Sequence, residues 1–291
     1  MQLSPFDGPN RSRVPGRRVI IAAVSLDVDG LLDWYARVRR PLPWRATRDP
    51  YALLVSEVML QQTQATRVVP YFEAFLARFP DPAALAAAPA PDVLAAWSGL
   101  GYNRRALALR AAARVIAERG WPADLTELPG VGPYTAAAVG SFAWGREQAA
   151  VDTNVRRVVE RLDGERRGPA ALAARAAELL PPGRAADFNQ AMMELGATVC
   201  GPRVPHCGEC PVRAGCTAHR TGGPAPPPPR RGAARFEDSD RWVRGRVLAA
   251  LLAGKPLPAA VAGAARARAL AGLERDGLIE LAPDGAPRLP T

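Results

Sequence analysis

A glycine-rich turn between two expected helices constrains the fold of this chain more than any other segment. The sequence LPGVGP at residues 128–133 ends on Pro133, a residue favoured at the first position of a helix, and an alanine-rich apolar run follows. Glycine permits backbone angles and close approaches that other residues resist. Successive N–H groups at a helix N-terminus also form a site for anions. The turn therefore predicts either an ordinary helix–turn–helix linker or a phosphate site built on Gly130 and Gly132.

The charge balance of the 291-residue chain points to an anionic partner. Lys and Arg number 38 against 28 Asp and Glu, which gives a formal net charge of +10. Guanidinium groups match phosphate geometry, so the balance points to nucleic acid or another anionic surface, and composition alone does not separate the two. No run of about 18 apolar residues occurs, so the sequence predicts no membrane contact by a spanning helix, and we expect a cytoplasmic protein.

Helical periodicity predicts an all-α core. Apolar residues recur at helical spacing over residues 28–38, and one helix is expected from Tyr51 to about Arg67, capped by Asp49. In the last segment of the chain, two helices followed by a hairpin around Gly285 suggest a small winged-helix-like module. The expected organisation is a flexible N-terminal arm (1–27), a helical core (28–199), a cysteine loop (200–218), a proline-rich linker (219–235) and a C-terminal module (236–291).

Two carboxylates are candidates for catalysis. Glu57 lies in the apolar run LLVSEVML at residues 53–60, where low-dielectric surroundings should raise its pKa. A carboxylic acid that stays protonated near neutral pH can donate a proton, although a buried ion pair with an arginine would suit the same run. Asp152, followed by Thr153 and Asn154, could face a developing positive charge or simply cap the next helix.

Four cysteines lie together near the end of the helical core. Cys200, Cys207, Cys210 and Cys216 have the spacing C-x6-C-x2-C-x5-C. Four thiolates this close can hold a zinc ion or an iron–sulfur cluster, and the spacing alone does not choose between them. A purely structural staple is the alternative to any redox role.

Three loops carry residues suited to contact a nucleic acid. In RPLPWR, residues 40–45, Trp44 stands between arginines, where it could stack on a base or anchor the loop on the core. The QQTQ segment at residues 61–64 could line a groove or solvate a helix end. The glycine loop at residues 99–105 presents Tyr102 beside two arginines, an arrangement typical of backbone clamping with a side-chain wedge.

Several of these segments together resemble adenine DNA glycosylases of the helix-hairpin-helix superfamily, the MutY-like group. They are LPWR (42–45), SEVMLQQTQ (56–64), GLGYNRRA (99–106), LPGVGPYTA (128–136), VDTNVRRV (151–158), MELGATVC (193–200) and the cysteine loop. The likeness spans about residues 30 to 218 and implies a two-lobed all-α core with a [4Fe-4S] cluster on the four cysteines. It implies a monomeric, nucleoid-associated bacterial repair enzyme that excises adenine mispaired with 8-oxoguanine or guanine in double-stranded DNA.

The resemblance also implies a role for individual residues. Glu57 corresponds to the general acid that protonates the flipped adenine, and Asp152 to the carboxylate that stabilises the oxocarbenium-like sugar, with Tyr134 and Asn154 in support. The positions that line the adenine pocket in the family correspond to Arg40, Leu42, Trp44, Arg45 and Glu194. Gln62 and Tyr102 match residues that wedge into the duplex, and the amides of Gly130 and Gly132 match those that hold the DNA backbone.

Two other functions are weighed against this one. Endonuclease III-like glycosylases, which act on pyrimidines, lack the glutamate at the Glu57 position, and the bifunctional ones carry Lys where this chain has Tyr134, so no Schiff base can form there. A non-catalytic DNA-binding iron–sulfur protein would not need both Glu57 and Asp152. The resemblance ends before residues 236–291, where many family members have a longer Nudix-like domain that reads 8-oxoguanine, so the preferred mispair stays open.

Overall fold

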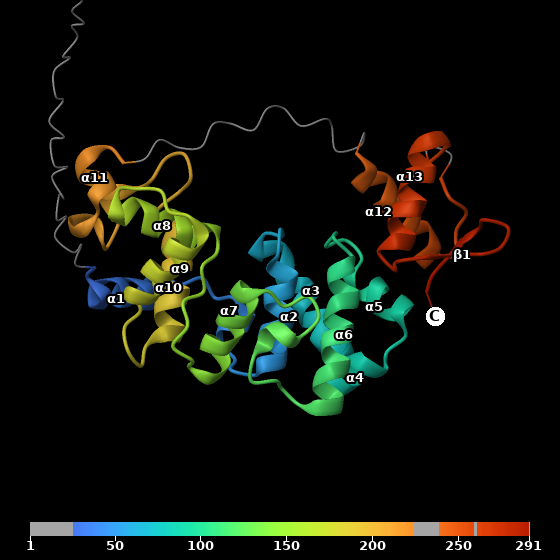
Figure 1. Ribbon diagram of the computed structural model, residues 1–291, viewed down its shortest axis with the longest axis horizontal. Helices are drawn as coiled ribbons and strands as arrows, with labels where there is room; N and C mark the ends of the chain where they lie inside the picture. The colour runs from blue at the N-terminus through green and yellow to red at the C-terminus, as the bar shows by residue number, and fades with distance from the viewer. Residues whose placement is uncertain (1–25, 224–238, 259–260, 291) are drawn as a thin grey trace, which may run out of the picture.

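The computed structural model describes residues 26–223, 239–258 and 261–290 (Figure 1). Most of the expected N-terminal arm and of the proline-rich linker lies outside these residues. The described core is helical, as predicted, and it divides into two lobes with separate hydrophobic interiors.

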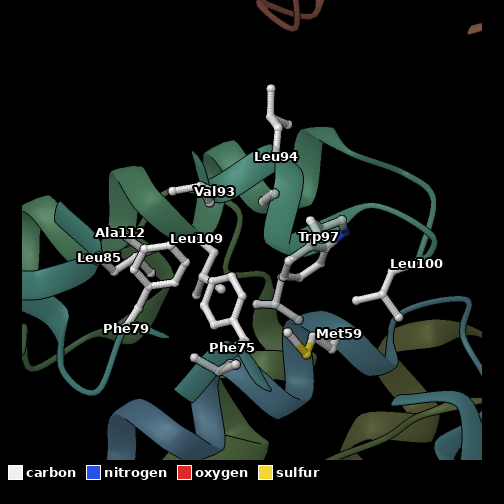
Figure 2. Packing of buried hydrophobic residues seen from close by; sticks show 14 of the residues in the cluster. Met59, Phe75, Phe79, Leu85, Val93, Leu94, Trp97, Leu100, Leu109 and Ala112 are labelled. Atoms are coloured by element: carbon white, nitrogen blue, oxygen red, sulfur yellow. The ribbon is translucent and has the colours of Figure 1, made fainter. Parts of the chain in front are cut away.

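The first lobe is built from the middle of the chain. Its helices are α2 (Pro50–Leu60), α3 (Ala65–Arg78), α4 (Pro82–Ala87), α5 (Ala90–Trp97), α6 (Arg104–Arg119) and α7 (Pro133–Trp144). Figure 2 shows its interior, where Phe75 packs edge-on against Trp97 with ring centroids 5.9 Å apart. Met59, from the turn of α2 that follows Glu57, is fully buried in the same cluster. The packing of α2 therefore fixes the position of Glu57.

The second lobe combines the first helix with later ones. Its helices are α1 (Val28–Val38), α8 (Thr153–Asp163), α9 (Pro169–Glu178), α10 (Ala185–Thr198) and α11 (Thr217–Thr221). Leu31, Val159 and Leu195 are completely buried together in its core. A small third cluster includes Leu53 of α2 and Ala138 of α7 from the first lobe, and Met193 of α10 from the second lobe packs against it. Two cores joined at this seam confirm the predicted two-lobed architecture.

One expected helix is in fact two. The helix predicted from Tyr51 to about Arg67 ends at Leu60, and α3 begins at Ala65. Gln62 between them has a φ of 59°, which a helix cannot contain. The Arg105 guanidinium donates to the carbonyls of Val58, Met59 and Gln61 at 2.7, 3.0 and 2.5 Å. Because this long-range partner satisfies the carbonyls at the end of α2, the helix stops there, and the prediction of one continuous helix was wrong.

The C-terminal segment contains the predicted two helices and hairpin. Helices α12 (Asp240–Leu252) and α13 (Gly263–Arg275) precede the antiparallel strands β1 (Glu280–Leu281) and β2 (Pro287–Arg288). These are the sole strands within the described residues. Val243 and Val247 of α12 join the hydrophobic cluster of the first lobe. The winged-helix likeness stays a prediction.

The four remaining short elements are single turns of 3-10 helix. They are Pro43–Arg45, Leu125–Glu127, Cys207–Glu209 and Arg213–Gly215. Across the described ranges, none of the helices has both the length and the apolar character needed to cross a bilayer.

Candidate active site

A cleft of about 1040 Å³ is lined by residues of both lobes. Many of the residues predicted from sequence line it: Arg40, Leu42, Trp44, Arg45, Glu57, Gln62, Tyr134, Asp152 and Asn154. Of the other predicted residues, Glu194 is buried beneath the cleft wall. Tyr102, Gly130, Gly132 and the four cysteines are not part of its lining.

Glu57 is an almost completely buried carboxyl group at the edge of this cleft. Glu57 is 4% exposed to solvent. Its Oε2 atom has no hydrogen-bond partner in the described part of the chain. Burial raises its pKa to about 7, the Tyr134 hydroxyl acts in the opposite direction, and the Asp152 charge adds to the rise. A pKa of about 7 means that a large fraction of Glu57 keeps its proton near neutral pH, and its Oε2 atom is open to a new hydrogen-bond partner.

Asp152 both caps a helix and lines the cleft. Its Oδ1 atom accepts from the backbone N–H groups of Asn154 and Val155 at 2.8 and 2.7 Å, the arrangement of an N-cap. Its Oδ2 atom accepts from the Asn154 side-chain amide at 2.8 Å. The structure confirms the helix cap, and Asp152 also lines the cleft, so its second interpretation stays a prediction. Three N–H donors fix the carboxylate in place at the positive end of α8.

Arg157 supports this arrangement from behind, and the sequence analysis missed it. Its Nη2 donates to Asn154 Oδ1 at 2.8 Å and to the Gly196 carbonyl at 2.5 Å. Its Nε donates to the Cys200 carbonyl at 2.7 Å. A Cβ atom on Gly196 would lie 2.5 Å from Asn154 Cβ, so glycine is what lets α10 approach α8 this closely. One side chain thereby joins the carboxylate site to the cysteine loop.

Glu194 organises the two arginines of the cleft wall. Although it is 0% exposed, its carboxylate accepts from Arg40 Nε and Nη2, both at 2.8 Å, and from Arg45 Nη2 at 2.7 Å. Burial favours the neutral form of Glu194, but the hydrogen bonds from Arg40 and Arg45 outweigh it and lower the pKa. Trp44, between these arginines, is buried and packs edge-on against Phe72 at 5.5 Å. The ring therefore anchors the loop while it also lines the cleft.

Gln62 and Tyr102 share an unusual backbone conformation. Within the described chain they are the non-glycine residues with positive φ, at 59° and 50°. Tyr102 is also 45% exposed, rare for a large aromatic residue here. Backbone strain of this kind persists only where surrounding contacts enforce it. Arg105, another residue the sequence analysis did not single out, supplies them by donating to the carbonyls of both Gln61 and Gly101.

The glycine turn places Gly130 and Gly132 in different situations. Gly130 has a φ of 77°, and a Cβ atom there would lie 2.7 Å from Ala108 Cβ on α6. Gly132 is the N-cap of α7, with φ −92° and open space where a side chain would be. Gly130 is therefore required by the fold, whereas Gly132 leaves the exposed N-terminus of α7 accessible to a ligand.

The four cysteines are free thiols, each partly buried, in the loop between α10 and α11. Burial raises the pKa of Cys210 to about 11, and the proximity of the other three cysteines contributes to the rise. Arg161 Nη1 lies 3.2 Å from Cys200 Sγ and offers a compensating positive charge. Among the described residues, no three His, Cys, Asp or Glu side chains converge as a single bound metal ion requires.

Comparison with known proteins identifies the family of this chain. Residues 55–182 match the family described as HhH-GPD superfamily base excision DNA repair protein. The chain is 44% identical over 281 residues to the adenine DNA glycosylase of Mycobacterium tuberculosis, which covers 89% of this chain and 92% of that protein. The chain belongs to the adenine DNA glycosylase family. The human family member is 41% identical over 221 residues, which cover 69% of this chain and 40% of the human protein.

Solved structures agree with this adenine DNA glycosylase assignment at the level of fold. A thermostable thymine-DNA glycosylase superposes with a TM-score of 0.62 at 33% identity, over 66% of this chain and 94% of that one. A trapped endonuclease III–DNA covalent intermediate superposes with a TM-score of 0.58 at 24% identity, over 66% and 93% of the two chains. The match to the Mycobacterium tuberculosis protein covers 89% of the present chain, so it extends beyond residue 236 into the C-terminal module.

Proposed function

We propose that this protein is a monofunctional glycosylase that hydrolyses the N-glycosidic bond of adenine mispaired with 8-oxoguanine or guanine in duplex DNA. The observation that carries the proposal is the pairing, in one cleft, of a buried Glu57 with a raised pKa and an Asp152 carboxyl group fixed by three N–H donors. Glycoside hydrolysis uses two carboxyl groups in different environments, one that donates a proton and one that stabilises positive charge. Membership of the adenine DNA glycosylase family supplies the substrate class.

The chemistry follows from the two environments. A base inside a duplex is out of reach, so the adenine must first leave the stack and enter the cleft. Protonated Glu57 then donates its proton to a ring nitrogen of adenine as the bond from the base to the sugar breaks. The Asp152 carboxylate stabilises the positive charge that develops on the sugar. Glu57, now ionised, takes a proton from the attacking water, and the products are adenine and an abasic site.

The remaining residues of the cleft hold and present the nucleotide. The Tyr134 hydroxyl, next to Glu57, and the Asn154 amide, next to Asp152, orient the two carboxyl groups. Arg40, Leu42 and Arg45 form the wall against which the base packs, with Glu194 fixing both arginines from beneath. The absence of a lysine amine at Tyr134 removes the route to a Schiff base, so strand cleavage should not accompany excision.

The strained turns at Gln62, in the cleft lining, and at Tyr102, outside it, are suited to open the duplex. Gln62 and Tyr102 project from left-handed backbone positions that Arg105 ties together, and an exposed aromatic side chain is suited to wedge between bases. The accessible amides at the N-terminus of α7, with Gly130 and Gly132 in the preceding turn, are suited to bind a DNA phosphate.

The cysteine loop supplies the ligands for a [4Fe-4S] cluster, the group that the family resemblance implies. Its four thiols provide the full ligand set for a cluster, and Arg161 stands next to Cys200 Sγ with a positive charge suited to thiolate ligands. Cys200, Cys207, Cys210 and Cys216 would hold the cluster, which would crosslink the end of α10 to α11. In this role the cluster would be a structural staple that holds the Cys200 carbonyl in place for its hydrogen bond with Arg157.

Excision from defined mispairs tests the proposed function. Duplexes carrying adenine opposite 8-oxoguanine, guanine, cytosine or thymine are incubated with excess enzyme, with and without alkali afterwards. Adenine release opposite 8-oxoguanine or guanine, with strand breaks only after alkali, is the expected result. Strand breaks without alkali, or release of a pyrimidine instead of adenine, would contradict it.

A further inference from the structure

One guanidinium joins two turns that are distant in the sequence. The side chain of Arg105, in the first turn of α6, donates to the Gln61 carbonyl at 2.5 Å and to the Gly101 carbonyl at 2.9 Å. Burial lowers the pKa of Arg105 to about 10, so the group keeps its charge near neutral pH although it is partly removed from solvent. Arginine suits this place because its planar fork offers five N–H donors to several acceptors at once.

Arg105 fixes the backbone on both sides of Tyr102, whose φ is 50°. It binds the carbonyl that precedes this residue, on Gly101, and at 3.4 Å the carbonyl of Tyr102 itself. The guanidinium carbon also lies 5.6 Å from the centre of the Tyr102 ring and 5.4 Å from that of Trp97. Trp97 is fully buried in the first lobe (Figure 2), so Arg105 connects the exposed tyrosine to the packed interior.

The same guanidinium holds the turn at Gln62, whose φ is 59°. Its acceptors there are the Gln61 carbonyl and, at 3.4 Å, the Thr63 hydroxyl, one on each side of the strained residue. Gln62 and Tyr102 are both exposed, so burial of their side chains does not fix either turn. Since a strained backbone persists only where its surroundings over-determine it, Arg105 is the common support of the two turns.

Arg105 also reaches the helix that contains the candidate acid. Its Nη1 donates to the carbonyls of Val58 and Met59 at 2.7 and 3.0 Å, directly after Glu57. Residues 51–59 of α2 are all buried, however, so packing holds Glu57 in place without this contact. The exposed turns lack such packing, and the support from Arg105 therefore matters more for them than for the acid.

We propose that Arg105 is a positioning residue for the opening of the duplex, because it holds Gln62 and Tyr102 as one unit whose side chains enter the base stack together. This inference rests on the proposed function, which assigns the wedging role to these two side chains. Arg105 is not part of the cleft lining, so it acts through them. Extruding a base costs free energy of unstacking, and side chains on a backbone that relaxes would supply less of it.

The first measurement follows the opening of the duplex without chemistry. The duplex carries 2-aminopurine, whose fluorescence rises when it is unstacked, next to an adenine opposite 8-oxoguanine. This adenosine has a 2′-fluorine, which destabilises a sugar cation and so prevents excision. For Arg105→Lys, which keeps the charge but not the planar fork, we expect fluorescence to rise at least about tenfold more slowly than for the wild type. Arg119→Ala, which removes an exposed arginine at the other end of α6, is the control and should match the wild type.

The second measurement compares single-turnover excision from two duplexes at saturating enzyme. In the first duplex the adenine has paired neighbours on both sides, and in the second duplex mispairs on both sides have already opened the stack. We expect Arg105→Lys to be slower than the wild type by at least about tenfold on the first duplex and by less than about threefold on the second. Support of Glu57 or of the fold alone would slow excision from both duplexes alike.

Equal losses on the two duplexes, or a wild-type rate of opening by Arg105→Lys, would overturn the proposal. Excision from the pre-opened duplex at nearly the wild-type rate supports it, and also shows that the variant is folded. Failure of the proposed function is seen separately, as absence of adenine release by the wild type from either duplex. The fluorescence measurement does not involve release and is independent of that result.

Discussion

Arg157 donates a 2.8 Å hydrogen bond to the side-chain oxygen of Asn154, whose amide donates in turn to the Asp152 carboxylate. The same guanidinium bonds the Cys200 carbonyl. The carboxylate proposed to stabilise the sugar cation is thus held in place by a chain of contacts that begins at the cysteine loop. Its orientation therefore depends in part on Arg157, which is not part of the cleft lining.

Replacing Arg157 with Ala should therefore slow excision without preventing DNA binding. Loss of a hydrogen bond from a charged donor corresponds to about 1.5–3 kcal/mol, or roughly a 10- to 100-fold lower single-turnover rate. Arg119→Ala, an exposed arginine at the end of α6, serves as the control. An unchanged rate in Arg157→Ala, with normal iron content, would show that Asp152 does not need this support.

Glu194→Gln should destabilise the protein at neutral pH. The substitution leaves Arg40 and Arg45 beside a buried neutral group, and removing one partner of a buried ion pair costs about 3 kcal/mol. Because the pKa of Glu194 is lowered in the folded state, its stabilisation is present above the unfolded pKa and is lost as the pH falls through the lower, folded value.

The difference between the wild type and Glu194→Gln in the free energy of unfolding should consequently shrink below about pH 4. Urea denaturation at neutral pH and in this acidic range measures it. Glu178→Gln, which removes an exposed partner of Arg175, should change stability little and serves as the control. Equal stability of the wild type and Glu194→Gln at neutral pH would contradict the assigned role.

Gly130→Ala and Gly132→Ala form a matched pair within one turn. The Gly130 substitution forces a positive φ on alanine and places a Cβ atom 2.7 Å from that of Ala108, so we expect a loss of about 1–3 kcal/mol in the free energy of unfolding. The Gly132 substitution meets neither obstacle and should leave the melting temperature nearly unchanged. Similar melting temperatures for both variants would refute this account of the turn.

The pH dependence of excision should report Glu57. As a general acid it must be protonated, and burial raises its pKa to about 7, so the single-turnover rate should fall as the pH rises above about 7. Each further pH unit lowers the protonated fraction about tenfold. A rate that stays constant from pH 6 to 9 would mean that another group donates the proton.

The sequence predicted those features that local pattern determines. The helix at residues 28–38, the Asp49 cap and the burial of Glu57 follow from apolar spacing and residue type, and the structure contains all three. The break at Gln62 was missed because its cause, Arg105, comes from a helix more than forty residues later. The sequence of residues 61–64 gives no sign that a distant guanidinium binds the carbonyl groups at the end of this helix.

The candidate site shows the same division. Resemblance to a family brought together residues of both lobes that periodicity could not connect, and many of them line one cleft. Arg157 remained unnoticed because its partners, Asn154, Gly196 and Cys200, belong to separate segments that meet only when α8 and α10 pack. Long arginine side chains reach several distant carbonyls, and sequence spacing carries no signal for such contacts.

The most direct test of the account is single-turnover excision by the wild type and Glu57→Gln on a duplex with adenine opposite 8-oxoguanine. The amide has nearly the same shape as the acid but no proton to donate. We predict a rate lower by at least about 100-fold, with duplex affinity close to that of the wild type. Excision at the wild-type rate by Glu57→Gln would contradict the assignment of this buried carboxyl group as the catalytic acid.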